Sequence, residues 1–160
     1  MRKSFSTLLL TALFLAFGAV FGTHAAEPDR FAEARQYYIE SGVEGFKTGV
    51  RIGGGGELTP EKIASARRAI GEWLDKDMIP FLRQNDILEE WVKMQLDADV
   101  RKANKRSAEA KSVDELMQIM RELDPLLKTR YPAAYAKLSS PEGVQLMQKL
   151  QVNLMKAMRQ

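Results

Sequence analysis

Apolar residues after Pro28 recur at intervals of three and four, and no segment alternates in the manner of a half-buried strand. The clearest case is the stripe formed by Ile63, Ala66, Ile70 and Trp73. This spacing puts side chains on one face of a helix, and such faces are buried by packing helices together. The sequence therefore predicts an all-α fold, a single-domain helical bundle of about five to seven helices.

Glycine and proline divide the first half of this pattern. We expect a first helix over residues 28–41 that ends at Gly42, and a short, frayed second one over residues 43–52, which glycines weaken. The run from Gly53 to Gly56 predicts a flexible loop. Thr59-Pro60 then opens a helix with a capping side chain, and Pro80 is expected to kink or divide it.

The second half carries further start and stop signals. Asn85-Asp86 precedes a pattern that predicts one helix running to about residue 110. Ser112 and Glu115 match the capping box, in which the two side chains satisfy backbone N–H groups. Prolines at positions 125 and 132 are expected to cut the region that follows into short pieces, and Ser140-Pro141 opens the last helix.

The N-terminus has the build of a secretory signal peptide. Arg2 and Lys3 come first, an apolar run spans residues 8–21, and Thr23-His24-Ala25 supplies a site of small residues for cleavage after Ala25 or Ala26. The run is shorter than a membrane-spanning helix requires. We expect a signal peptide over residues 1–25, a single helical domain over 26–160 without an integral membrane segment, and a periplasmic or secreted location.

Cleavage would change the chemistry available to the chain. The charge of the full sequence is +3, and loss of Arg2 and Lys3 leaves 22 basic against 21 acidic residues, a net charge of +1. The chain has no Cys, and its one His is His24 in the leader. A Ser-His-Asp triad, a cysteine nucleophile and a typical zinc site are then all excluded. We expect no enzymatic activity, no cofactor and no metal; an enzyme that uses carboxylates alone is a third hypothesis.

Two further patterns each have a plain interpretation. Met117 and Met120, like Met155 and Met158, share a helix face, which could present thioethers to copper but is more typical of a core or an adaptable groove. The basic segment 101–111 has no aromatic residue for base stacking, and we interpret it as a solvated helix end. Neither pattern leads us to expect a metal or a nucleic acid.

The C-terminal segment from Tyr135 to Met147 carries a motif. An aromatic-bearing helix precedes Ser140-Pro141-Glu142-Gly143, and an amphipathic helix rich in Leu and Met follows. This arrangement resembles the S-P-x-G signature of a family of small exported bacterial helical proteins whose domain has no assigned function. The resemblance implies a helical bundle located in the cell envelope, and it supplies no catalytic residues.

Large apolar side chains provide the remaining functional signal, because a bundle of this size need not bury them all. An apolar groove between helices could bind a protein partner or a second copy of the chain. The alternative is a carrier that closes a cavity around a lipid or a small apolar ligand. The candidate binding residues are Trp73, Phe81, Trp91, Met117 and Met120.

Overall fold

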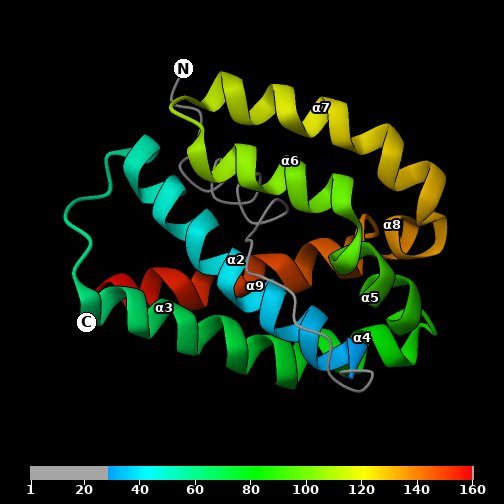
Figure 1. Cartoon of the computed structure of the whole chain (residues 1–160). Coiled ribbons are helices and arrows are strands. Elements are labelled where there is room, and N and C mark those ends of the chain that lie inside the picture. The colour runs from blue at the N-terminus through cyan, green and yellow to red at the C-terminus, as the bar shows by residue number, and fades with distance from the viewer. Residues whose placement is uncertain (1–28, 160) are drawn as a thin grey trace.

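The computed structural model describes residues 29–159 as helices joined by short connections, without a strand in that range (Figure 1). This confirms the predicted all-α, single-domain bundle. The predicted signal peptide lies outside the described residues, and no helix inside them is long and apolar enough to cross a membrane. The elements are α2 (Arg30–Gly53), α3 (Pro60–Trp73), the π-helical turn η1 (Leu74–Met78), α4 (Ile79–Gln84), α5 (Leu88–Leu96), α6 (Ala98–Glu109), α7 (Val113–Arg130), α8 (Pro132–Leu138) and α9 (Pro141–Met158).

Helix α2 is one continuous helix, so the predicted break at Gly42 is wrong. Gly42 is buried against α3, and a Cβ atom there would lie 2.9 Å from Cδ1 of Ile70. The glycine thus allows α3 to approach and does not end the helix. The end comes at Gly53, after which Gly54 has a left-handed φ of 68° and its N–H donates to the carbonyl of Val50. The glycine-rich connection therefore begins one residue later than expected.

Pro80 divides the next helix, as predicted, through a change of helical type. Its ring has no N–H to donate to the preceding turn. The turn η1 widens instead, and the N–H of Ile79 donates to the carbonyl of Leu74, five residues earlier. Two ion pairs hold η1 in place. Asp75 pairs with Arg35 of α2 at 2.6 Å, and Asp77 pairs with Lys149 of α9 at 2.5 Å.

Two other boundaries differ from the prediction. The helix expected over residues 85–110 is broken at Asp97, whose carboxylate accepts from the N–H groups of Asp99 and Val100 and so caps α6. Conversely, Pro125 lies inside a continuous α7. Pro125 is exposed, so water can satisfy the carbonyl group that its missing N–H leaves unpaired.

Three predicted helix starts are confirmed. The hydroxyls of Thr59, Ser112 and Ser140 accept from backbone N–H groups at the starts of α3, α7 and α9. The chain also breaks between α7 and α8 before Pro132, as expected. Gly143 has a packing role, because a Cβ atom there would lie 2.6 Å from the carbonyl oxygen of Lys137 and still closer to that of Leu138. The S-P-x-G segment therefore seats the start of α9 on the end of α8.

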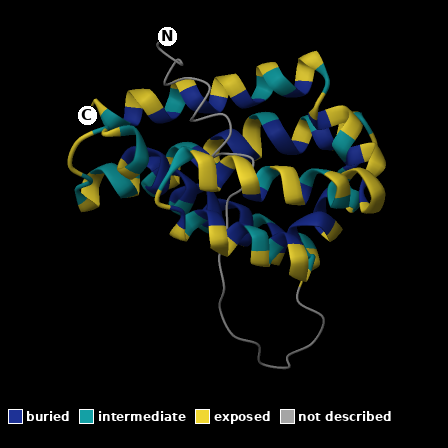
Figure 2. Ribbon diagram, turned by 90° about the horizontal axis from the view of Figure 1, so that it is seen from above, coloured by how far each residue is buried: buried dark blue, intermediate teal, exposed yellow. Residues whose placement is uncertain are grey.

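The core lies between α2 and the helices around it, with buried faces turned inward and exposed faces outward (Figure 2). Helix α2 packs against α3, α5 and α6, and α9 packs against α3 and α8. Tyr38 stands at the centre between two tryptophans. Its ring centroid is 6.2 Å from that of Trp73, with the rings stacked, and 5.6 Å from that of Trp91, with the rings tilted. This aromatic layer forms one wall of the site described next.

Candidate functional site

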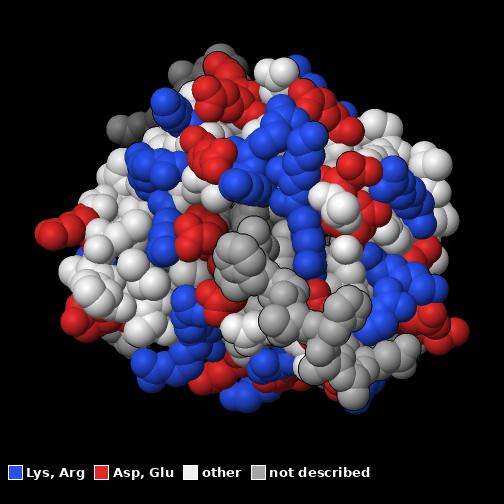
Figure 3. Space-filling model, in the orientation of Figure 1, with Lys and Arg blue, Asp and Glu red and all other residues white. Residues whose placement is uncertain are grey.

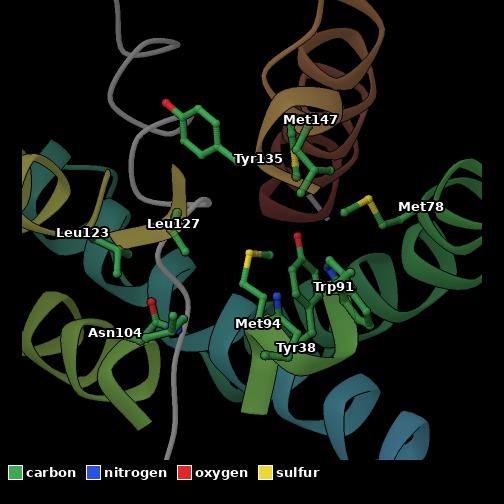
Figure 4. A pocket seen from close by; sticks show the side chains of 12 residues that line it. Tyr38, Met78, Trp91, Met94, Asn104, Leu123, Leu127, Tyr135 and Met147 are labelled. Atoms are coloured by element: carbon green, nitrogen blue, oxygen red, sulfur yellow. The ribbon is translucent and has the colours of Figure 1, made fainter. Parts of the chain in front are cut away.

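A pocket of about 40 Å³ lies inside the bundle beside this aromatic layer (Figure 4). Every one of its lining residues is uncharged, and seven elements contribute to it. Leu127 on α7 and Tyr135 on α8 are only half-buried, whereas the other lining residues are buried, so the pocket opens between these two helices. The lining residues are Tyr38, Met78, Trp91, Met94, Gln95, Val100, Asn104, Leu123, Leu127, Tyr135, Leu138 and Met147.

The hydroxyl of Tyr38 is a buried polar group at this pocket. The residue is 7% exposed, and its hydroxyl has no hydrogen-bond partner within residues 29–159. Burial raises the pKa of Tyr38 far above its ordinary value of 10.0, so the hydroxyl keeps its proton. It can therefore donate a hydrogen bond to whatever occupies the pocket.

The indole of Trp91 presents a second such group. Trp91 is fully buried, and its Nε1 has no partner in the described part of the chain. Trp73 differs, because its Nε1 donates to the carbonyl of Leu146 at 3.0 Å. Buried polar groups are paired in the large majority of cases, so two unpaired donors at one pocket require an explanation.

Two other polar side chains of the pocket, those of Asn104 and Tyr135, have structural roles. Asn104 donates from Nδ2 to the hydroxyl of Tyr37 at 3.0 Å. The hydroxyl of Tyr135 donates to Asp124 at the mouth. These contacts hold α6 to α2 and α8 to α7.

Three methionines supply much of the apolar lining. Met78 comes from η1, Met94 from α5 and Met147 from α9, and all three are buried. Figure 4 shows their side chains placed around the pocket with Tyr38 and Trp91 among them. Methionine is unbranched and flexible, so such a lining adapts its shape to an occupant.

The residues predicted as a binding site are distributed over several places. Trp91 lines the pocket, and Trp73 lies behind Tyr38 in the aromatic layer. Phe81 on α4 and Met120 on α7 are half-buried against the core, and Met117 on α7 is exposed. The structure thus joins the two tryptophans through Tyr38 and leaves the other three residues outside the pocket.

Sequence reasoning did not single out the rest of the pocket. Tyr38, Met78, Met94 and Met147 occupy helical positions that look like ordinary core positions. Asn104 offered the one usable signal, since it is a polar residue on the buried face of the basic helix α6.

Several charged groups outside the pocket pair with groups of opposite charge. On α6, Arg101 pairs with Glu33 at 2.9 Å and Arg106 with Glu122 at 2.5 Å. Figure 3 accordingly shows Lys and Arg interspersed with Asp and Glu over the visible face. Glu90 accepts from the N–H of Ala134 at the start of α8, which gives it a structural role. Within residues 29–159, no cluster of three or more His, Cys, Asp or Glu could hold a metal ion.

Comparison with protein-family models, with curated proteins and with solved structures gave no match. The resemblance of the C-terminal segment to a family of exported helical proteins therefore stays a prediction.

Proposed function

We propose that this chain is an exported, non-enzymatic binding protein that takes a small, mainly apolar ligand into the pocket between α2, α5, α7 and α9. The observation that carries the proposal is the pair of buried, unpartnered hydrogen-bonding groups of Tyr38 and Trp91 in a pocket without charged lining residues. Leaving such groups unpaired costs stability, and a ligand that pairs with them would recover that loss.

The size of the pocket is compatible with this function. A volume of about 40 Å³ is room for about three water molecules, or for the polar end of a ligand. Movement of Met78, Met94 and Met147 would enlarge it, and the opening between Leu127 and Tyr135 leaves a path for the remainder of the ligand. No Asp, Glu, His or Lys lines the pocket, so it offers no ordinary general acid or base.

An interaction surface is the second candidate. Val152 and Met155 lie three residues apart on α9, and they are 46% and 42% exposed. A second copy of the chain could cover them. Two exposed apolar side chains are ordinary for a monomer, so we rank this candidate below ligand binding; light scattering of the purified protein would show a dimer if it holds.

Native mass spectrometry of the protein purified from the cells that make it tests ligand binding. We expect a retained small molecule on the wild type and its loss in Leu127→Trp, which fills the mouth of the pocket. Met117→Trp is the matched control, because it introduces the same side chain on the exposed face of the same helix. An empty wild type that no apolar compound stabilises against heat would contradict the proposal.

A further inference from the structure

We propose that the ligand is an uncharged molecule whose polar end is a carbonyl oxygen, held by the hydroxyl of Tyr38 and the indole N–H of Trp91. This inference rests on the proposed function, since it names the chemical class that the same pocket selects. It excludes carboxylates such as fatty-acid anions, and it excludes amines. Three features of the pocket support this ligand class: the polarity of the two unpartnered groups, the absence of charged lining residues, and the shape of the space.

The two unpartnered groups are both hydrogen-bond donors, so the ligand must supply an acceptor. An indole N–H is a donor only, and the neutral phenol of Tyr38 has a proton to donate. Both are buried, and both residues line the same pocket with their ring centroids 5.6 Å apart. A carbonyl oxygen has two lone pairs and can accept from both at once. A hydroxyl could accept as well, but its own proton would need an acceptor in turn.

The pocket offers nothing to neutralise a charged ligand. None of its lining residues is Asp, Glu, Lys or Arg. The carboxylate of Asp124, at the mouth, already accepts from Tyr135 and pairs with Lys128 at 2.7 Å. Burying an isolated ion without a partner is far more costly than burying a neutral polar group that is hydrogen-bonded. A carboxylate or an ammonium group would therefore be rejected.

The shape places the polar end deep and the apolar end outward. The hydroxyl of Tyr38 and the indole N–H of Trp91 are both buried, whereas the half-buried Leu127 and Tyr135 border the opening. The enclosed volume fits a group of a few heavy atoms. A short alkyl chain attached to it would follow the methionines toward the mouth, so a methyl ketone is a fitting probe.

The test is a titration of the purified protein with hexan-2-one, hexane, hexanoate and hexylamine, followed by ligand-observed NMR. We expect the ketone to bind at least about threefold more tightly than hexane, and the two ions to bind more weakly than either. Tyr38→Phe should weaken ketone binding about three- to tenfold and leave hexane binding unchanged. Tyr131→Phe is the matched control, because it removes a hydroxyl that donates to Asp97 away from the pocket.

The outcomes separate this inference from the proposed function. If hexane binds as tightly as the ketone, the ligand class is wrong although an apolar site exists. If hexanoate or hexylamine binds best, the requirement for a neutral ligand is wrong. If none of the four probes binds, both this inference and the proposed function are overturned. Even if Tyr38→Phe does not fold, the ratio of ketone to hexane affinity in the wild type shows whether the pocket selects a carbonyl group.

Discussion

At the scale of single residues, the two tryptophans are equally well buried but differ in hydrogen bonding. Trp73 donates its indole N–H to the carbonyl of Leu146, while the indole N–H of Trp91 and the hydroxyl of Tyr38 are unpaired beside the pocket. A buried hydroxyl without a partner lowers stability by about 1–3 kcal/mol, a cost that an apolar residue of the same shape avoids. A hydroxyl at position 38 is thus better explained by binding than by folding.

We therefore expect Tyr38→Phe to raise the free energy of unfolding of the ligand-free protein by about 1 kcal/mol. Urea denaturation followed by circular dichroism measures this value. Tyr131→Phe should do the opposite and lower the free energy by about 1–2 kcal/mol, because the hydroxyl of Tyr131 donates to Asp97 at 2.7 Å. If both variants lose stability equally, the Tyr38 hydroxyl is paired in the free protein and our interpretation of it fails.

At the scale of helices, the junction between α8 and α9 depends on one glycine. A Cβ atom at position 143 would collide with backbone carbonyls of Lys137 and Leu138, which cannot move aside as a flexible side chain does. We expect Gly143→Ala to lower the free energy of unfolding by about 2–4 kcal/mol. Gly71→Ala, in the interior of α3, is the control.

The control should behave differently because the space around Gly71 accommodates a methyl group. A Cβ atom at Gly71 would lie 3.6 Å from Cδ1 of Ile39, an ordinary contact, and alanine favours a helix over glycine by about 1 kcal/mol. Thermal or urea denaturation of the two variants should therefore shift in opposite directions. Equal shifts would show that the close approach at position 143 is not what constrains this junction.

Helix identity could be predicted from the sequence, and several helix limits could not. Periodicity and capping residues are local, so the starts at Thr59, Ser112 and Ser140 were found. Gly42 lies inside a helix because it packs closely against Ile70 of another helix. Spacing along the chain does not show this contact. Pro125 is tolerated because it faces outward, which again depends on the packed structure.

The candidate site was less predictable for the same reason. Trp91 was singled out because it is large, and it does line the pocket. Tyr38, Met78 and Met147 come from three separate elements and share the spacing of ordinary core residues. A position that packs against a neighbour and one that borders a pocket give the same pattern along a helix. The difference appears only when the elements are assembled.

At the scale of the whole molecule, the carboxylate of Asp97 connects the α5–α6 junction to the α7–α8 junction. Asp97 lies between α5 and α6, and it accepts from the hydroxyl of Tyr131 and pairs with Arg130 at 2.9 Å, where α7 meets α8. Burial would raise the pKa of Asp97. The hydrogen bonds from Tyr131, from Arg130 and from the backbone outweigh burial and hold the pKa below its ordinary value of 3.8.

The sign of the pH dependence follows from this lowered pKa. The stabilisation from ionised Asp97 is complete above the unfolded-state pKa and is lost as the pH falls through the lower folded-state pKa. We expect Asp97→Asn to cost about 1–2 kcal/mol at pH 7, and the difference from the wild type to shrink below about pH 4. Urea titrations across this range provide the measurement.

Asp99→Asn is the control for this comparison. Asp99 also pairs with Arg130 at 2.9 Å, but its side chain is 55% exposed, against 10% for Asp97. A solvated ion pair contributes about 0–1 kcal/mol, so this variant should remain close to the wild type at every pH. If the stability lost in Asp97→Asn stays constant down to pH 3, the charge of Asp97 is not what connects the α5–α6 and α7–α8 junctions.

The unequal hydrogen bonding of the two tryptophans also makes them unequal as chromophores. The environment of Trp73 is closed, since its indole N–H is already bonded to Leu146 and Tyr38 separates it from the pocket. An occupant of the pocket would meet only Trp91, and a new hydrogen bond at its N–H would shift the emission of that indole alone. The protein therefore contains an intrinsic fluorescent reporter together with its own internal reference.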